Sequence, residues 1–133
     1  MRIQHIGYLV KNIAKSVEEF LRLGYVQETE IYEDKDRAIT ICFMLNGGVR
    51  VELVAPMGDQ SAVCNLLDKT GEAPYHICYV SDDWENDLRE LTAAKYIIVA
   101  PEKPAIAFGG KNVAFLYKKN VGLIELVEGG ENA

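Results

Sequence analysis

Apolar and polar residues alternate along several short stretches of the chain, and this period of two predicts strands with one buried face. Turn residues separate many of these stretches, as Gly47 and Gly48 do between two of them. The predicted strands cover residues 4–10, 25–32, 38–45, 49–54, 75–80, 96–100, 112–117 and 123–127.

An apolar period near 3.6 residues predicts two longer helices between these strands. The first begins after Asn12, a suitable N-cap, and ends before Gly24, while the second is capped near Asp82. Ser61 is the expected N-cap of a third, short helix, and residues 101–110, which contain prolines and glycines, are expected to form a loop. The apolar positions are Ile13, Val17, Phe20 and Leu21 in the first helix and Trp84, Leu88 and Leu91 in the second.

The order strand, helix, strand, strand, strand occurs twice, which predicts two βαβββ modules in tandem. Module one spans about residues 1–56, a connector spans 57–74, and module two spans about 75–130. With 133 residues, of which 49% are hydrophobic, the chain can form one compact domain with a real core. The predicted fold class is α+β, with a curved mixed sheet in a single domain over residues 1–133 and helices on its outer face.

The two modules also repeat a set of polar residues. The sequence contains two histidines, His5 and His76, and each opens a copy of the motif His-Ile-x-Tyr. Glu52 and Glu125 open two copies of Glu-Leu-Val, 47 positions after His5 and 49 positions after His76. Both histidines and two carboxylates therefore occupy equivalent places in the repeat.

Strand alternation predicts where these four side chains point. Their sequence neighbours belong to the opposite face of each strand, so all four project onto the concave face if the helices cover the other face. A single strand histidine is more often a hydrogen-bonded core or surface residue, but four repeat-equivalent polar groups favour a metal site. Two imidazoles and two carboxylates form a ligand set for one divalent transition metal, namely nickel, cobalt, zinc or manganese.

Charge and composition argue against several other partners and sites. The formal net charge is −6 and the lysines and arginines are scattered, so we expect no binding to nucleic acid or to an anionic membrane. The chain has no apolar run of 18 residues and its first ten residues lack the long apolar stretch of a signal peptide, so we expect a cytoplasmic protein. Its three cysteines include no C-x-x-C pair, which argues against a disulfide framework and against a thiolate zinc site.

These patterns resemble a known superfamily. Paired modules with His, Glu, His and Glu on their first and last strands are similar to the vicinal oxygen chelate superfamily, which includes glyoxalase I, methylmalonyl-CoA epimerases, extradiol dioxygenases and bleomycin-binding proteins. Within it, the chain looks most like methylmalonyl-CoA epimerases and glyoxalase-like proteins. The likeness rests on RVELVAPMGDQS at residues 50–61, YHICYV at 75–80, FGGKNVAFL at 108–116 and GLIEL at 122–126.

The resemblance implies a metal-dependent isomerase or lyase that removes a proton next to a carbonyl, with the enolate stabilised by the metal. The implied metal ligands are His5, Glu52, His76 and Glu125. Glu125 would also be the catalytic proton shuttle. The implied substrate is a small acyl thioester or 2-oxo compound, and by analogy we expect a homodimer.

The chain departs from the epimerase pattern on one strand. Family members carry a second glutamate on the strand equivalent to residues 38–45, where this chain has Thr40 and Ile41. This weakens the epimerase interpretation more than the glyoxalase I (lactoylglutathione lyase) interpretation, because glyoxalase chemistry asks less of a second base. Two alternatives stay open: a metal-dependent dioxygenase, which Glu52 argues against, and a non-catalytic drug-binding protein, which the complete ligand set argues against.

Overall fold

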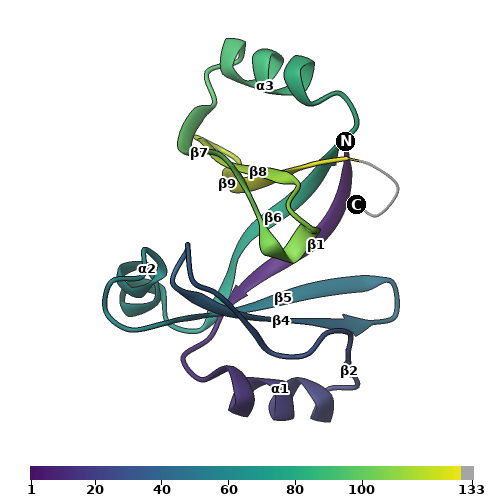
Figure 1. Ribbon diagram of the computed structural model, residues 1–133, viewed down its shortest axis with the longest axis vertical. Helices are drawn as coiled ribbons and strands as arrows, with labels where there is room; N and C mark the ends of the chain where they lie inside the picture. Colours follow the sequence, from purple (N-terminus) through teal and green to yellow (C-terminus); the bar gives the residue numbers. More distant parts are fainter. Residues whose placement is uncertain (130–133) are drawn as a thin grey trace. The chain divides into compact units, whose positions relative to one another are not determined.

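The computed structural model describes residues 1–129, which form two compact units. The first unit is His5–Tyr75, and the second consists of Met1–Gln4 together with the chain from His76 onward. Figure 1 labels the three helices and every strand except β3. Within residues 1–129, no helix is both long enough and apolar enough to cross a membrane.

The first unit is a mixed sheet with a helix packed on one face. Its strand order is β2-β4-β5-β1, with β3 also paired to β4. β4 runs antiparallel to β2, β3 and β5, whereas β1 runs parallel to β5. The elements are β1 (Arg2–Leu9, of which His5 onward belongs here), α1 (Ile13–Arg22), β2 (Val26–Gln27), β3 (Tyr32–Asp34), β4 (Ile39–Asn46), β5 (Val49–Pro56) and α2 (Val63–Thr70).

Local signals set the bounds of α1, as the sequence predicts. The Oδ1 atom of Asn12 accepts the backbone N–H of Lys15 at 3.1 Å, and Gly24 follows the C-cap with a φ of 94°, which suits glycine. The apolar side of α1 covers one face of the sheet. The core on that face consists of Val10, Val17, Cys42, Met44, Val51, Leu53 and Ala55, with Tyr8, Ile13, Phe20 and Tyr25 packed against it.

The second unit repeats this arrangement, with the strand order β6-β9-β8-β7. β6 runs parallel to β9, while the β8–β9 and β7–β8 pairs are antiparallel. The elements are β6 (Ala73–Ser81, of which His76 onward belongs here), α3 (Trp84–Ala93), β7 (Ile97–Pro104), a 3₁₀ turn (Ile106–Phe108), β8 (Asn112–Lys118) and β9 (Gly122–Glu128). One face packs Ala114, Leu116, Ile124 and Leu126 against Trp84, Leu88 and Leu91 of α3, and the other contains Cys78, Val80, Ala105, Val113 and Val127. The predicted α+β class and the doubled strand-helix-strand order are therefore confirmed.

The prediction of one strand over residues 25–32 is wrong, because this segment contains the separate strand β2 and only the start of β3. Between them, the hydroxyl of Thr29 accepts the backbone N–H of Phe43 at 3.0 Å, while the N–H groups of Glu28 and Thr29 both donate to the carbonyl of Phe43. Two residues thus face one, as in a bulge, and the regular ladder is interrupted. The first module consequently has one strand more than predicted.

The loop predicted over residues 101–110 is wrong in its first part, where β7 continues to Pro104. Its pairing with β8 is irregular, with register shifts on both sides of Ala100. β7 is the last strand in the order of its unit, and an edge strand tolerates prolines because one side of its backbone needs no ladder partner. The turn that follows, at residues 106–108, completes the connection to β8.

Ser61 is not the N-cap of α2. The helix begins at Val63 after Ala62, and no side chain caps it. Ser61 is buried instead, and its carbonyl accepts the backbone N–H of Cys64 at 3.1 Å. The prediction that Ser61 caps this helix is therefore wrong, because its side chain is buried and does not bond to the first turn.

Candidate metal centre

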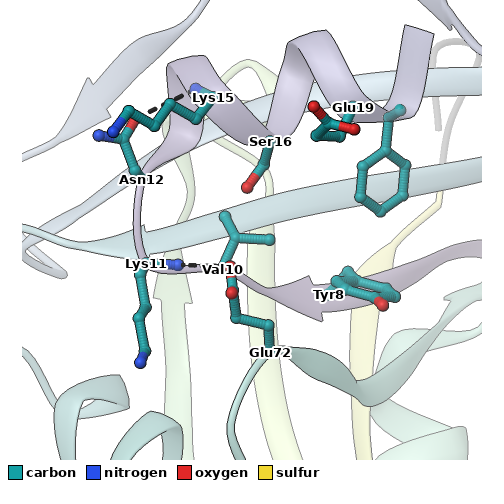
Figure 2. A pocket seen from close by; sticks show the side chains of 9 residues that line it. Tyr8, Val10, Lys11, Asn12, Lys15, Ser16, Glu19 and Glu72 are labelled. Carbon is teal, nitrogen blue, oxygen red and sulfur yellow. Dashed lines mark hydrogen bonds between the residues drawn. The ribbon is translucent and has the colours of Figure 1, made fainter. Parts of the chain in front are cut away.

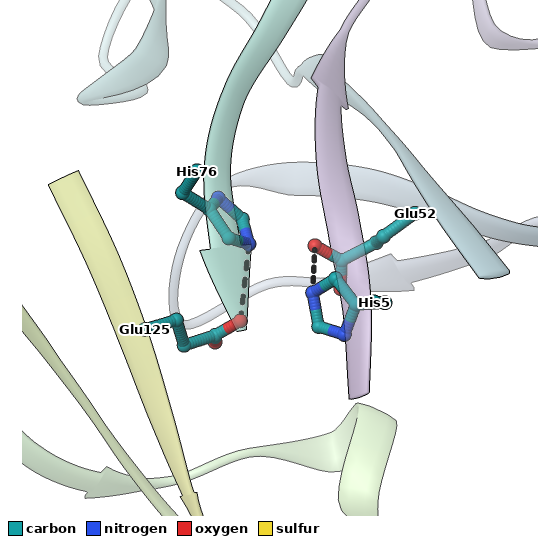
Figure 3. Close-up of side chains that lie close together, drawn as sticks. All are labelled: His5, Glu52, His76 and Glu125. Atoms are coloured by element: carbon teal, nitrogen blue, oxygen red, sulfur yellow. Dashed lines mark ion pairs between the residues drawn. The ribbon is translucent and has the colours of Figure 1, made fainter. Parts of the chain in front are cut away.

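The first unit brings His5 and Glu52 together. Gly7 of β1 lies beside Glu52 of β5 in the parallel pair, so His5, two residues earlier, points to the same face as the carboxylate. Nε2 of His5 lies 3.5 Å from Oε1 of Glu52, and both side chains are buried. Figure 3 shows this pair with a dashed line between the two atoms.

The second unit brings His76 and Glu125 together in the same way. Cys78 of β6 lies beside Glu125 of β9, and His76 again precedes the paired residue by two. Nε2 of His76 lies 3.1 Å from Oε1 of Glu125, and both side chains are buried (Figure 3). Each copy of the repeat therefore places one imidazole nitrogen beside one carboxylate oxygen.

An aromatic ring contacts the histidine of each pair. Phe43 of β4 lies opposite Glu52, and Phe115 of β8 lies opposite Glu125. Both rings meet the histidine of their own unit edge-on, at centroid distances of 5.4 Å for His5 and 5.3 Å for His76. The repeat thus extends to a third residue type. In the sequence, Phe43 precedes Glu52 by nine residues and Phe115 precedes Glu125 by ten, and this similar spacing could have indicated the shared role.

The chemistry of each pair suits a divalent transition metal. A buried carboxylate needs a compensating partner, and a neutral imidazole beside it supplies only a hydrogen bond. Imidazole nitrogen and carboxylate oxygen are both ligands of zinc, nickel, cobalt and manganese. The residues present in each unit therefore fit half of the ligand set that the sequence predicts.

Tyr32 of β3 is a further polar residue on the face of Glu52. It lies opposite Ile41, which lies opposite Val54, and Val54 shares a strand face with Glu52 two residues away. Burial, followed by the negative charges of Glu52 and Asp34, raises the pKa of the Tyr32 phenol well above its ordinary value. The phenol is therefore a hydrogen-bond donor over the physiological pH range, a role the sequence did not indicate.

The strand expected to hold a second base contains no carboxylate. Ile41 and Phe43 occupy the face of β4 that lies on the same side of the sheet as Glu52, and Thr40 belongs to the opposite face. Glu33 lies opposite Thr40 and is exposed, while the carboxylate of buried Asp34 is bound to Arg37 at 3.2 Å. The departure from the epimerase pattern noted in the sequence is thus also present in the folded first unit.

A cavity of about 430 Å³ lies beside α1 on the other face of β1. Figure 2 shows Ser16 and Glu19 on the helix above Tyr8 of the strand, and the backbone N–H of Lys11 donates to the carboxylate of Glu72 at 3.2 Å. Two lysines and two glutamates balance its charge. It is lined by Tyr8, Val10, Lys11, Asn12, Lys15, Ser16, Glu19, Phe20 and Glu72, and by none of the predicted ligands.

Sequence comparison identifies relatives over nearly the whole chain. The sequence model of the Glyoxalase/Bleomycin resistance protein/Dioxygenase superfamily matches residues 4–115. The mitochondrial methylmalonyl-CoA epimerase of Dictyostelium discoideum is 28% identical over 130 residues, which cover 96% of this chain and 78% of that protein. The ethylmalonyl-CoA/methylmalonyl-CoA epimerase of Cereibacter sphaeroides is 24% identical over 128 residues, which cover 94% of this chain and 96% of that protein.

Structural comparison agrees on the fold. A Streptomyces coelicolor methylmalonyl-CoA epimerase variant, solved in complex with 2-nitronate-propionyl-CoA, superposes with a TM-score of 0.84 at 23% sequence identity. The superposition covers 99% of this chain and 96% of that one. At this level of identity the likeness establishes the fold and leaves the reaction to be argued from the residues.

Proposed function

The chain belongs to the glyoxalase/bleomycin resistance protein/dioxygenase superfamily, and from that premise we propose that it is a metal-dependent epimerase acting on a small acyl thioester, of the methylmalonyl-CoA epimerase type. The observation that carries the proposal is the repetition of one geometry. Each unit holds a buried histidine and a buried glutamate in contact, in the same strand register and with the same edge-on phenylalanine. Relatives that bear the epimerase name support the substrate class.

We propose that the two pairs hold one divalent metal together. Each of the four residues offers one ligand atom, a ring nitrogen or a carboxylate oxygen. Two carboxylates balance the charge of one divalent cation, and nickel, cobalt, zinc and manganese all accept such a mixed set. When bound, the metal would act as a Lewis acid that stabilises negative charge on the carbonyl oxygen of a substrate.

Glu125 is the proposed base of the reaction. A carboxylate can accept the proton from the carbon next to a carbonyl, and a buried carboxylate is held free of competing water. Nε2 of His76 lies 3.1 Å from Oε1 of Glu125 and restrains its position. The proton would move from the substrate carbon to a carboxylate oxygen of Glu125. For epimerisation, the planar enolate would then take a proton from water on its opposite face, and Glu125 would release its own proton to solvent.

A glyoxalase-type isomerase is the second candidate, and one observation favours it. An epimerase of the two-base kind needs an acid on the opposite side of the carbon, and β4 carries no carboxylate on its site face. An isomerase that returns the proton to a neighbouring carbon uses one base. Under this candidate the substrate is a hemithioacetal, and the ligands and Glu125 keep their roles.

The deciding experiment has a metal arm and a proton arm. The purified protein, resupplied with each of the four metals, should bind about one equivalent per site and then exchange substrate hydrogen with solvent deuterium. Exchange into methylmalonyl-CoA supports the epimerase, and exchange into a glutathione hemithioacetal supports the isomerase. Failure to bind any of the metals contradicts both candidates.

Two variants sharpen this experiment. Glu125→Gln should lower the exchange rate by about 10²-fold or more, because the amide is no base. Glu128→Gln is the matched control, since Glu128 ends the same strand and its carboxylate accepts the backbone N–H of Asn112 at 3.4 Å. Equal exchange by the Glu125→Gln variant and the unchanged protein would remove Glu125 from the proposed mechanism.

We further propose that the protein is a cytoplasmic homodimer. The support is analogy within the superfamily for the dimer, and, for the compartment, that Cys42, Cys64 and Cys78 form no disulfide within residues 1–129. Sedimentation equilibrium of the metal-loaded protein measures the mass directly. A mass that stays monomeric at micromolar concentration contradicts the dimer and leaves the proposed reaction standing.

A further inference from the structure

The ammonium group of Lys111 is buried without a partner. Its Nζ atom has no solvent-exposed surface and makes no hydrogen bond within residues 1–129. The nearby carboxylate of Glu128 accepts the backbone N–H of Asn112 instead. Burial of an unpaired cation costs free energy, so we expect a lysine in this position to have a function.

The backbone around Lys111 is held on both sides. Its carbonyl accepts the N–H of Ala105 at 2.9 Å, which continues the β7–β8 ladder by one step, and its own N–H donates to the carbonyl of Phe108 at 3.3 Å. These bonds close the turn that contains Gly109 and Gly110. The lysine is therefore fixed at the start of β8 and does not belong to a free loop.

Strand alternation places Lys111 on the face of the second unit that carries the candidate ligands. It lies one residue before β8 and precedes Val113 and Phe115 by two and four residues. Because the backbone pairing extends to Lys111, continued alternation places the three on the same side of the sheet. Phe115 meets the ring of His76 edge-on, and Val113 packs with Cys78, which shares a strand face with His76. The positive charge thus lies on the same side of the sheet as the His76–Glu125 pair.

We propose that Lys111 is an anion-binding residue, whose ammonium pairs with an oxyanion of the substrate, a carboxylate or a phosphate. This inference rests on the proposed function for the nature of the substrate, since acyl-CoA compounds carry phosphates and some acyl groups carry a carboxylate. An ammonium that is already stripped of water binds such a group with little further desolvation. The missing partner in the free protein is then the ligand itself.

The proposal is tested by anion binding to the metal-free protein, so that no catalytic step enters the measurement. Sodium malonate supplies a carboxylate probe, inorganic phosphate supplies a phosphate probe, and affinity is measured by calorimetry and by the rise in melting temperature with ligand concentration. Lys111→Met removes the charge and keeps a long apolar stem. Lys119→Met is the matched control, because Lys119 is exposed.

We expect at least one probe to bind the unchanged protein and the Lys119→Met variant, and to bind Lys111→Met about thirtyfold more weakly. Preference for malonate assigns the contact to an acyl carboxylate, and preference for phosphate assigns it to the CoA part. Equal binding by Lys111→Met, or no binding of either anion to the unchanged protein, overturns the proposal. Metal binding and deuterium exchange by the unchanged protein are measured separately, so failure here is distinguishable from failure of the proposed function.

Discussion

The ring of Phe115 stands edge-on against the imidazole of His76, with centroids 5.3 Å apart and planes at 87°. Phe43 meets His5 in the same way, at 5.4 Å and 79°. Such contacts place the positive edge of one ring against the negative face of the other and fix the orientation of the histidine. The imidazole of each unit is therefore held by an apolar neighbour on one side and by a glutamate on the other.

Replacement of Phe115 by leucine should loosen His76. We expect the free energy of unfolding to fall by about 1 kcal/mol, the usual contribution of an aromatic pair, and metal affinity to fall about fivefold. Phe20→Leu is the control, because Phe20 makes similar edge contacts with Tyr8 and Tyr25 in the core under α1. It should lose stability and keep metal affinity. Calorimetric metal titration of both variants checks this, and equal affinities would contradict a positioning role for Phe115.

Tyr32 should make the protein sensitive to alkali. Burial first, then the charges of Glu52 and Asp34, raise the pKa of its phenol in the folded state above that in the unfolded chain. The folded state therefore holds a proton that the unfolded state releases above pH about 10, and stability falls as the pH rises through that value. The Tyr32→Phe variant should lose less stability than the unchanged protein between pH 9 and 11. Urea unfolding at steps of about half a pH unit measures this loss. An unchanged slope would show that Tyr32 does not contribute.

Glu28 and Arg50 should contribute stability that acid removes. The carboxylate of Glu28 accepts two bonds from the guanidinium of Arg50, at 2.7 and 2.9 Å, and these bonds lower the pKa of Glu28. Stability from the pair is present above the ordinary carboxyl pKa and is lost as the pH falls through the lowered one. Because both side chains are about a third exposed, Glu28→Gln should cost at most about 1 kcal/mol at pH 7.

The difference in the free energy of unfolding between the Glu28→Gln variant and the unchanged protein should then disappear below pH about 4. Glu19→Gln is the control for this measurement, since Glu19 pairs with Arg22 at 3.5 Å where both side chains are largely exposed. Chemical denaturation at pH 7 and pH 3 tests both variants. If the difference in the free energy of unfolding persists at pH 3, the effect of Glu28→Gln comes from lost packing and not from the ion pair.

The two long helices should respond differently to loss of their N-cap side chains. Asn12→Ala removes the bond to the N–H of Lys15 and should cost about 1 kcal/mol of stability. Asp83 is the N-cap of α3 but makes no side-chain capping bond, so Asp83→Ala should cost clearly less. Thermal melts of the two variants provide the comparison. Equal losses would mean that the interaction of the Asp83 charge with the dipole of α3 contributes as much stability as the capping bond of Asn12.

Local sequence signals predicted much of the fold because they act over a few residues. Asn12 and Gly24 mark the ends of α1, and the Gly47-Gly48 turn joins β4 to β5, as the structure shows. Alternation along β1, β5, β6 and β9 predicted which side chains share a face. The errors lie at Thr29, Ser61 and Pro101, where a side-chain hydrogen bond, burial or an edge position in the sheet outweighed local preference.

By itself, the sequence determined that two histidines and two glutamates recur in equivalent places, since a repeat and a period of two need only the order of residues. Only the tertiary structure decided that β1 pairs with β5 and β6 with β9 in parallel, with each histidine two residues before the residue beside its glutamate. It also placed Phe43, Tyr32 and Lys111 on the faces of those ligands. Such pairings join segments more than 40 residues apart, and no local pattern encodes them, because they depend on packing over the whole unit.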